Sequence, residues 1–216
     1  MVWTVLTFLQ IDHGKRYHPS SHDKSPHEHI LSQLVSQKII EPRAFSLYIH
    51  DVNKLGGELL FGRVDIENYE GKLLSIPFVE RVRKTVVNSS LSLNNVRMTD
   101  ATNKTTVLSS NFAQVHALLD SGNAAMVLPD EIVNQIYSRP RANTNVPEKP
   151  TVDCSLIKDT TTIDFDFENE HRIKVPLSQI IFPIESVAQY PLWGIVKSST
   201  VNFNISLLFF FCFSAY

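Results

Sequence analysis

An apolar run that leads directly into a carboxylate is the feature of this sequence best suited to chemistry. The segment His116-Ala-Leu-Leu-Asp-Ser-Gly122 carries Asp120 near its end, followed by two small residues. Small residues let another stretch of backbone approach closely, so we expect Asp120 to end a strand inside the protein, buried or half-buried. A carboxylate held there can accept or donate a proton during a reaction. Taken alone, Asp-Ser-Gly also fits an ordinary turn after a strand.

Two other groups of polar side chains could be taken for sites. Four histidines, His18, His22, His27 and His29, lie in a polar stretch without helix or strand periodicity. Imidazole nitrogens bind metals, but no regular element is predicted to hold these side chains together, so we interpret the stretch as a solvated loop and expect no metal.

The second group consists of the acids Asp164, Asp166 and Glu168, which alternate with apolar residues. A period of two places them together on one face of a strand. We predict that this is the solvent-facing side, because Asp and Glu are rarely buried.

The composition predicts a mostly β fold. Only seven glycines occur, and short runs of Val, Ile, Leu, Phe and Thr are broken by Asn, Asp and Pro, which indicates many short strands joined by turns. A net charge of −2 offers no basic surface for a polyanion, so no nucleic-acid partner is expected. Cys154 and Cys212 lack the spacing of a zinc site and can form at most one disulfide bridge. No cofactor is predicted.

Neither end of the chain predicts a signal peptide or a membrane anchor. The apolar segment from Val2 to Leu9 has no basic residue before it and no small-residue cleavage site after it. The apolar segment from Leu207 to Phe213 is much shorter than the roughly 20 residues that span a bilayer. Three tripeptides fit the N-glycosylation pattern, which matters only in a secreted protein: Asn88-Ser-Ser, Asn103-Lys-Thr and Asn204-Ile-Ser.

Periodicity and turn residues predict the elements that position Asp120. Ser25-Pro-His-Glu28 resembles a capping box, so a helix is expected from there until Pro42 stops it. A second short helix is predicted from Pro129 to Tyr137, directly after the Asp120 segment. Hairpins are predicted at Phe45–Gly62 and at Thr162–Glu168 with Arg172–Val175, and further strands at Lys72–Pro77, Lys84–Val87, Leu91–Arg97, Thr105–Leu108 and Gln114–Leu119.

Six stretches, taken in order, form a recognisable pattern: Ala44-Phe-Ser-Leu-Tyr-Ile, Gly57-Glu-Leu-Leu-Phe-Gly-Arg-Val-Asp65, Tyr69-Glu-Gly-Lys-Leu, Leu118-Leu-Asp-Ser-Gly122, Leu128-Pro-Asp-Glu-Ile132 and Val152-Asp-Cys154. In this order they resemble the pepsin-like aspartic proteases of fungi, and most of all the secreted or cell-surface enzymes of yeasts. The resemblance covers residues 17–205. Residues 1–16 and 206–216 have no counterpart, and we hypothesise that they come from a wrong gene boundary or a retained intron.

The resemblance implies that the chain is the C-terminal lobe of a two-lobed acid endopeptidase that cleaves peptide or protein substrates outside the cell or at its surface. In this family each lobe contributes one aspartate to a cleft for an extended peptide. Carried over, Asp120 is one catalytic carboxylate, and Gly122 and Asn123 line the substrate cleft. The partner required is the N-terminal lobe that carries the first aspartate.

The sequence departs from the family pattern at three points. Asn123 replaces the usual Thr or Ser, no second Asp-Thr/Ser-Gly occurs, and no cysteine lies near Tyr190, where the family has the disulfide partner of Cys154. We therefore expect little or no catalysis from this chain alone. Two other hypotheses remain open: a non-catalytic secreted β-domain that at most binds extended peptide, and a two-fold dimer that brings two copies of Asp120 together.

Overall fold

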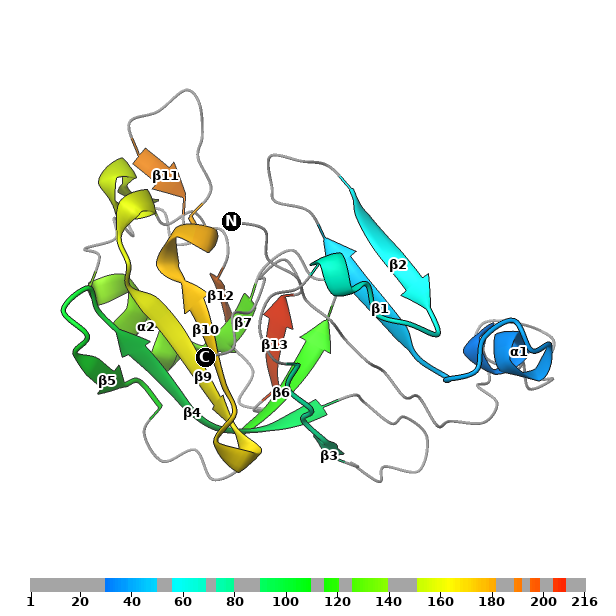
Figure 1. Ribbon diagram of the computed structural model, residues 1–216. Coiled ribbons are helices and arrows are strands. Elements are labelled where there is room, and N and C mark those ends of the chain that lie inside the picture. Colours follow the sequence, from blue (N-terminus) through cyan, green and yellow to red (C-terminus); the bar gives the residue numbers. More distant parts are fainter. Residues whose placement is uncertain are drawn as a thin grey trace, which may run out of the picture. The chain divides into compact units, whose positions relative to one another are not determined.

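A computed structural model of the chain describes ten stretches of residues in two compact units. The stretches are 30–49, 56–68, 73–79, 90–109, 115–120, 126–139, 151–181, 189–191, 195–198 and 204–208. The first unit spans Met1–Glu70 and the second Gly71–Tyr216 (Figure 1). Each unit is described by itself.

The first unit combines a short helix with a β-hairpin. Its elements are α1 (Ile30–Ser36), β1 (Phe45–Ile49), β2 (Gly57–Phe61) and the 3-10 turn η1 (Ile66–Asn68). The predicted helix is confirmed, although its capping box lies outside the described residues. The helix ends well before Pro42, because Lys38 adopts a left-handed φ of 60°. The Lys38 and Ile39 amides then donate to the Val35 and Leu34 carbonyls, the hydrogen-bond pattern of a Schellman motif.

The predicted hairpin is also confirmed. β1 and β2 pair antiparallel, with Phe45 opposite Phe61 and Ile49 opposite Gly57. Among residues 45–48 of β1, Ser46 and Tyr48 are buried, whereas Phe45 and Leu47 are only partly buried.

The second unit is built on one open, nine-stranded sheet. Its strands follow the order β10-β9-β4-β6-β13-β7-β12, with β3 and β5 also paired to β4. Their bounds are β3 (Phe78–Val79), β4 (Ser90–Thr99), β5 (Thr105–Val107), β6 (Val115–Asp120), β7 (Met126–Pro129), β9 (Thr162–Phe167), β10 (Arg172–Pro176), β12 (Ile195–Ser198) and β13 (Asn204–Leu208). A separate pair joins β8 (Thr151–Asp153) to β11 (Gln189–Pro191).

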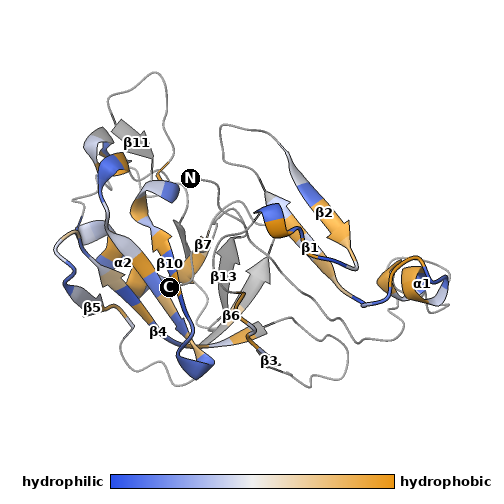
Figure 2. Cartoon of the chain, in the orientation of Figure 1, coloured by the Kyte–Doolittle hydropathy of each residue, from blue (hydrophilic) through white to orange (hydrophobic). Residues whose placement is uncertain are grey.

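One face of this sheet carries the core. Helix α2 (Asp130–Ser138) contributes Ile132, Val133 and Ile136, each 0 % exposed. They join Phe165 and Phe167 of β9 and the alternate residues of β4 and β10. Hydrophobic and hydrophilic stretches alternate along these strands (Figure 2), as expected when only one face of a strand is in the core. The 3-10 turns η2 (Cys154–Lys158), η3 (Glu168–Glu170) and η4 (Leu177–Gln179) connect the remaining strands.

The predicted mostly β class is confirmed, as are the strands at β4, β5 and β6, the second helix and the second hairpin. The strand predicted at Lys72–Pro77 is wrong, because residues 73–77 have no strand pairing and β3 begins only at Phe78. Lys84–Val87 lies outside the described residues. Among the described residues no helix is long and apolar enough to cross a bilayer.

Candidate active site

Asp120 is the last residue of β6, a strand in the interior of the sheet. On one side β6 pairs with β4, and on the other it runs parallel to β13, with Asp120 opposite Leu208. Ala117, three residues before Asp120, is 0 % exposed. Residues 116–118 are paired with both neighbours and Asp120 with β13, so the backbone at the end of β6 is held in place, which is what a reactive carboxylate requires.

The strand after Asp120 lies on the far side of β13. β7 begins at Met126 and pairs with β13 and with β12, so β13 separates two strands that follow each other in sequence. β6 is parallel to β13 and β7 is antiparallel to it. The end of β6 and the start of β7 therefore lie at the same edge of the sheet, about 10 Å apart across one strand. Residues 121–125, which join them, include Gly122 and Asn123 and lie outside the described residues.

Helix α2 packs against β7 in the core of the second unit. It starts at Asp130, immediately after β7, with Pro129 at its N-cap position and two acids, Asp130 and Glu131, in its first turn. Acidic side chains there interact favourably with the positive end of the helix dipole. Met126 and Leu128 of β7 are buried in the same core as the helix. Sequence periodicity predicts this helix, but not the four-residue strand before it.

Cys154 is the first residue of η2, directly after β8. β8 pairs with β11 so that Val152 lies opposite Tyr190 and Asp153 opposite Gln189. Asp153 caps the turn by accepting a hydrogen bond from the Ser155 amide at 2.8 Å. Hydrogen bonds from Ser155 lower the pKa of Asp153. The register brings residue 190 next to the Cys154 segment, where the family resemblance places the partner cysteine. Tyr190 occupies this position, so the partner cysteine of the family is missing there, and Cys212 lies outside the described residues.

The acids of β9 are not on a solvent-facing surface, so that prediction is wrong. Asp164 is 0 % exposed and Asp166 is 8 % exposed, whereas Glu168 is exposed as expected. The cause is the position of β9 between β4 and β10. Long side chains of both neighbours extend over the second face of the sheet and cover the carboxylates.

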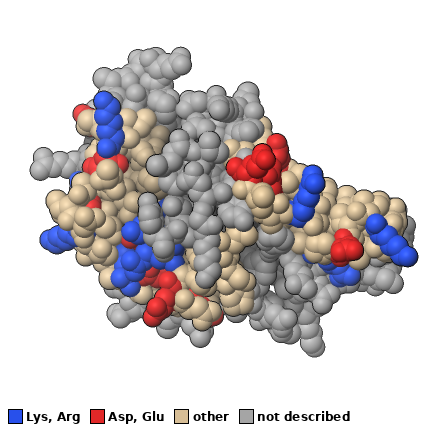
Figure 3. All heavy atoms as spheres, viewed as in Figure 1, with Lys and Arg blue, Asp and Glu red and all other residues tan. Residues whose placement is uncertain are grey.

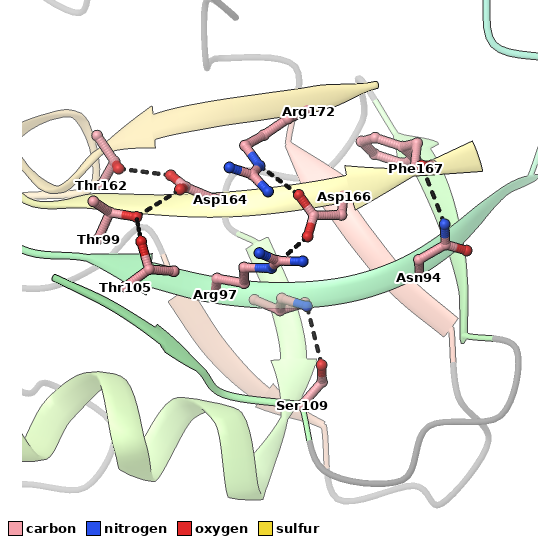
Figure 4. Close-up of polar contacts among 11 residues, drawn as sticks. Asn94, Arg97, Thr99, Thr105, Ser109, Thr162, Asp164, Asp166, Phe167 and Arg172 are labelled. Carbon is pink, nitrogen blue, oxygen red and sulfur yellow. Dashed lines mark hydrogen bonds and ion pairs between the residues drawn. The ribbon is translucent and has the colours of Figure 1, made fainter. Parts of the chain in front are cut away.

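Each buried acid has polar partners (Figure 4). Asp164 accepts hydrogen bonds from Thr99 at 2.8 Å and Thr162 at 2.6 Å. Asp166 Oδ1 accepts a hydrogen bond from Arg172 Nε at 2.5 Å. Its Oδ2 lies 2.5 Å from Arg97 Nε, a charge contact without hydrogen-bond geometry. The hydrogen bond to Asp166 raises the pKa of Arg172. Buried charges are stable only when paired in this way.

A hollow of about 570 Å³ opens over this cluster, lined by Asn94, Asn95, Arg97, Asp166, Phe167, Glu170, Arg172 and Lys174. Acidic and basic side chains lie side by side on this part of the surface (Figure 3). Asp164 and Asp166 are occupied by their hydroxyl and arginine partners, so we interpret the cluster as structural. Within the described stretches no group of three or more His, Cys, Asp or Glu side chains is arranged to hold a metal.

Comparisons with known proteins cover most of the chain. The sequence model of the family "Eukaryotic aspartyl protease" matches residues 14–208. Candidapepsin-2 of Candida parapsilosis is 31% identical over 82% of the chain, and Aspartic proteinase 3 of Saccharomyces cerevisiae is 30% identical over 74%. Secreted aspartic protease 1 of Candida albicans is 26% identical over 73%.

The chain spans only 40%, 28% and 37% of the lengths of these three relatives, respectively. Such partial coverage, together with open sheets of short strands, fits one β-rich lobe of a pepsin-like protein. Because the family match covers most of the sequence, from residue 14 to residue 208, the chain belongs to the eukaryotic aspartyl protease family.

Proposed function

We propose that the protein is an acid endopeptidase in which Asp120 supplies one of two catalytic carboxylates. The observation that carries this proposal is the position of Asp120 at the end of β6, an interior strand with the buried residue Ala117, at the edge where β7 also begins. An acid in this position can face a cleft while its backbone is paired with β13 and residues 116–118 of its strand are paired on both sides. Family membership gives that carboxylate its proposed role.

The second carboxylate comes from another lobe in this proposal. Asp120-Ser-Gly is the only segment of its kind in the 216 residues, and two aspartates are needed for the reaction. The ionised acid takes a proton from water as the oxygen attacks the peptide carbonyl carbon. The protonated acid donates to the carbonyl oxygen, which gives a tetrahedral diol. The acid that took the proton from water then passes it to the amide nitrogen, the carbon–nitrogen bond breaks to release the amine, and a diol hydroxyl returns a proton to the other acid. Gly122 and Asn123 line the cleft by backbone contact with the peptide.

The proposed substrates are peptide or protein chains bound in extended form. The proposed location is outside the cell or at its surface, supported by relatives named as secreted proteases. In this proposal residues 17–205 form the lobe, and residues 1–16 and 206–216 lie outside it. The boundary at residue 205 falls within β13, which pairs with β6 as far as Leu208.

An alternative function is peptide binding without cleavage. It is favoured by Asn123, which stands where the family has Thr or Ser, and by the lack of a second Asp-Thr/Ser-Gly in the sequence. The domain would then keep the sheet edge at Asp120 as a surface for extended peptides but perform no chemistry.

A complementation assay tests the proposal. The full chain is mixed with the remaining lobe of Candidapepsin-2, and cleavage of a denatured protein is measured at acid pH. We expect cleavage that is abolished by Asp120→Asn and unaffected by Asp130→Asn, the same change at an exposed helix position. Equal cleavage by the wild type and Asp120→Asn would contradict the assignment. Peptide binding without any cleavage would select the alternative.

A further inference from the structure

The hairpin between β4 and β5 ends in a tightly closed turn. The Asp100 amide donates to the Lys104 carbonyl at 3.0 Å, and the Asn103 amide donates to the Asp100 carbonyl at 2.9 Å. Three residues, 101–103, therefore connect the strands. Asn103 occupies the last of these positions with a left-handed φ of 63°. Three-residue hairpin loops place a left-handed residue there, and Asn tolerates that conformation better than most residues do.

The Asp100 side chain fixes this turn. Its Oδ1 accepts hydrogen bonds from the Thr102 amide at 2.9 Å, the Thr102 hydroxyl at 2.6 Å and the Lys104 amide at 3.0 Å. Residues 101–105 are all exposed. The Asp100 carboxylate thus fixes the backbone of the turn, while Asn103 is exposed to solvent at its tip.

Asn103 also begins one of the three acceptor tripeptides for N-linked glycans. Lys104 is not proline, and Thr105 supplies the hydroxyl that the pattern requires. We propose that Asn103 is an N-glycosylation site of this protein when it enters the secretory route. The inference rests on that route and on the geometry of the turn, and not on the proposed catalytic role of Asp120.

The co-reactant is an oligosaccharide linked to a lipid pyrophosphate. The Nδ2 atom of Asn103 attacks the anomeric carbon of the first sugar and loses one proton. A carbon–nitrogen bond forms, the bond from that carbon to the pyrophosphate oxygen breaks, and lipid pyrophosphate leaves. No oxidant or reductant is consumed. A bulky, hydrated product requires an exposed asparagine, which the turn provides.

The other two tripeptides differ in their setting. Asn88 lies outside the described residues. Asn204 is the first residue of β13, which is paired to β6 and also contacts β7 in the sheet interior. A glycan on Asn103 would instead be attached at the tip of the hairpin, next to β5. Among the described strands β5 pairs only with β4, and Val107 in it is 52% exposed. A glycan there would shield a sheet edge that could otherwise pair with another chain.

The proposal is tested in the full chain with Asn88→Gln and Asn204→Gln, so that Asn103 is the only acceptor left. The chain is expressed in yeast behind a cleavable secretory leader, and the cell lysate is analysed by gel mobility before and after endoglycosidase H. We expect one mobility shift that the enzyme removes. Because the lysate is analysed, the result does not depend on export or on protease activity.

Two variants at one position provide the matched control. Thr105→Val removes the required hydroxyl with little change in shape and should abolish the shift. Thr105→Ser keeps the hydroxyl and should retain it. The proposal is overturned if the background chain shows no shift, or if the shift survives Thr105→Val. As a further control, the same chain is fused to a leader that carries a mutation blocking entry into the secretory route. No variant should then show the gel-mobility shift.

Discussion

At the scale of single residues, the second acid of β9 is central to the outer face of the sheet. Asp166 is almost fully buried between two arginines whose side chains remain 30% and 37% exposed. Sequence alternation correctly places the β9 acids on one face. It fails to predict their burial, because the covering side chains come from β4, some 70 positions earlier, and from β10. Nothing in the local pattern indicates that Arg97 would extend over Asp166.

Asp166→Asn should destabilise the second unit. The change keeps the shape but removes the charge that both arginines face, and hydrogen bonds to charged groups contribute about 1.5–3 kcal/mol. Because both arginines are partly exposed, we expect a loss near the lower end of that range. Urea unfolding followed by circular dichroism measures it. Glu168→Gln, an exposed acid two residues later, should change the stability by less than about 0.5 kcal/mol. Equal changes in unfolding free energy for Asp166→Asn and Glu168→Gln would show that the buried contacts of Asp166 with the two arginines do not stabilise the unit.

Asp100 should titrate below its ordinary range. The hydrogen bond from the Thr102 side chain is the main cause that lowers the pKa of Asp100, and amide hydrogen bonds add to it. With the folded pKa below the unfolded one, this contribution to stability is present above the ordinary value of 3.8. It is lost as the pH falls through the lower folded value.

Thr102→Ala removes the largest of these causes, so the pKa of Asp100 should rise towards the ordinary value. Carboxyl chemical shifts followed by NMR between pH 1.5 and 6, roughly the range in which Asp titrates, measure this change directly. Thr106→Ala, a change in the same hairpin outside the turn, is the control and should leave the titration of Asp100 unaltered. An unchanged titration in Thr102→Ala would contradict the role of the Thr102 hydroxyl.

At the scale of elements, what could be predicted depends on how local the signal is. Both helices, the two hairpins and the long strand β4 follow from periodicity and turn residues over short windows. The strands missed are short and depend on distant partners. β13 and β12 run parallel to β6 and β7, more than 60 residues earlier, and a pattern read over a short window does not reveal such distant partners.

The candidate site shows the same division between local and distant signals. A strand ending at Asp120 and a helix soon after it follow from nearby residues. The insertion of β13 between β6 and β7 does not, because it depends on a segment near residue 205. That insertion brings the start of β7 to the edge where Asp120 lies. The family resemblance therefore predicts the role of Asp120, whereas only the structure reveals which strands surround this residue.

Within the first unit, Gly62→Ala should destabilise the hairpin. Gly62 has a φ of 73°, and an added Cβ would lie 2.7 Å from Cβ of Ile40. A non-glycine residue held in a left-handed conformation costs about 1–3 kcal/mol, and the close contact adds to this. Hydrogen exchange at the β1 and β2 amides should show faster opening. Arg63→Ala, an exposed change one residue later, should leave exchange unchanged, and equal protection in Gly62→Ala would indicate that Ile40 moves aside without cost.

At the scale of the whole molecule, the proposed function requires a second catalytic aspartate besides Asp120. Two carboxylates that share a site cannot both ionise easily, so one holds a proton while the other accepts one. Activity of such a pair is confined to the acid range in which a single proton is shared. One Asp120 segment per chain leaves two ways to complete the pair: a second lobe of different sequence, or a second copy of this chain.

A titration of the chain against the remaining lobe of Candidapepsin-2 distinguishes these two arrangements. If a second lobe completes the pair, activity should rise until the two components are equimolar and then stay constant. The pH profile should be bell-shaped in the acid range, because loss or gain of the shared proton stops the reaction. The chain alone should remain inactive however concentrated it is. A two-fold dimer predicts the reverse, since its activity would need no second component and would rise with the square of the concentration while dimers are rare. Activity of that kind, lost in Asp120→Asn, would replace the second lobe with a second copy of the chain and would keep Asp120 as the catalytic group.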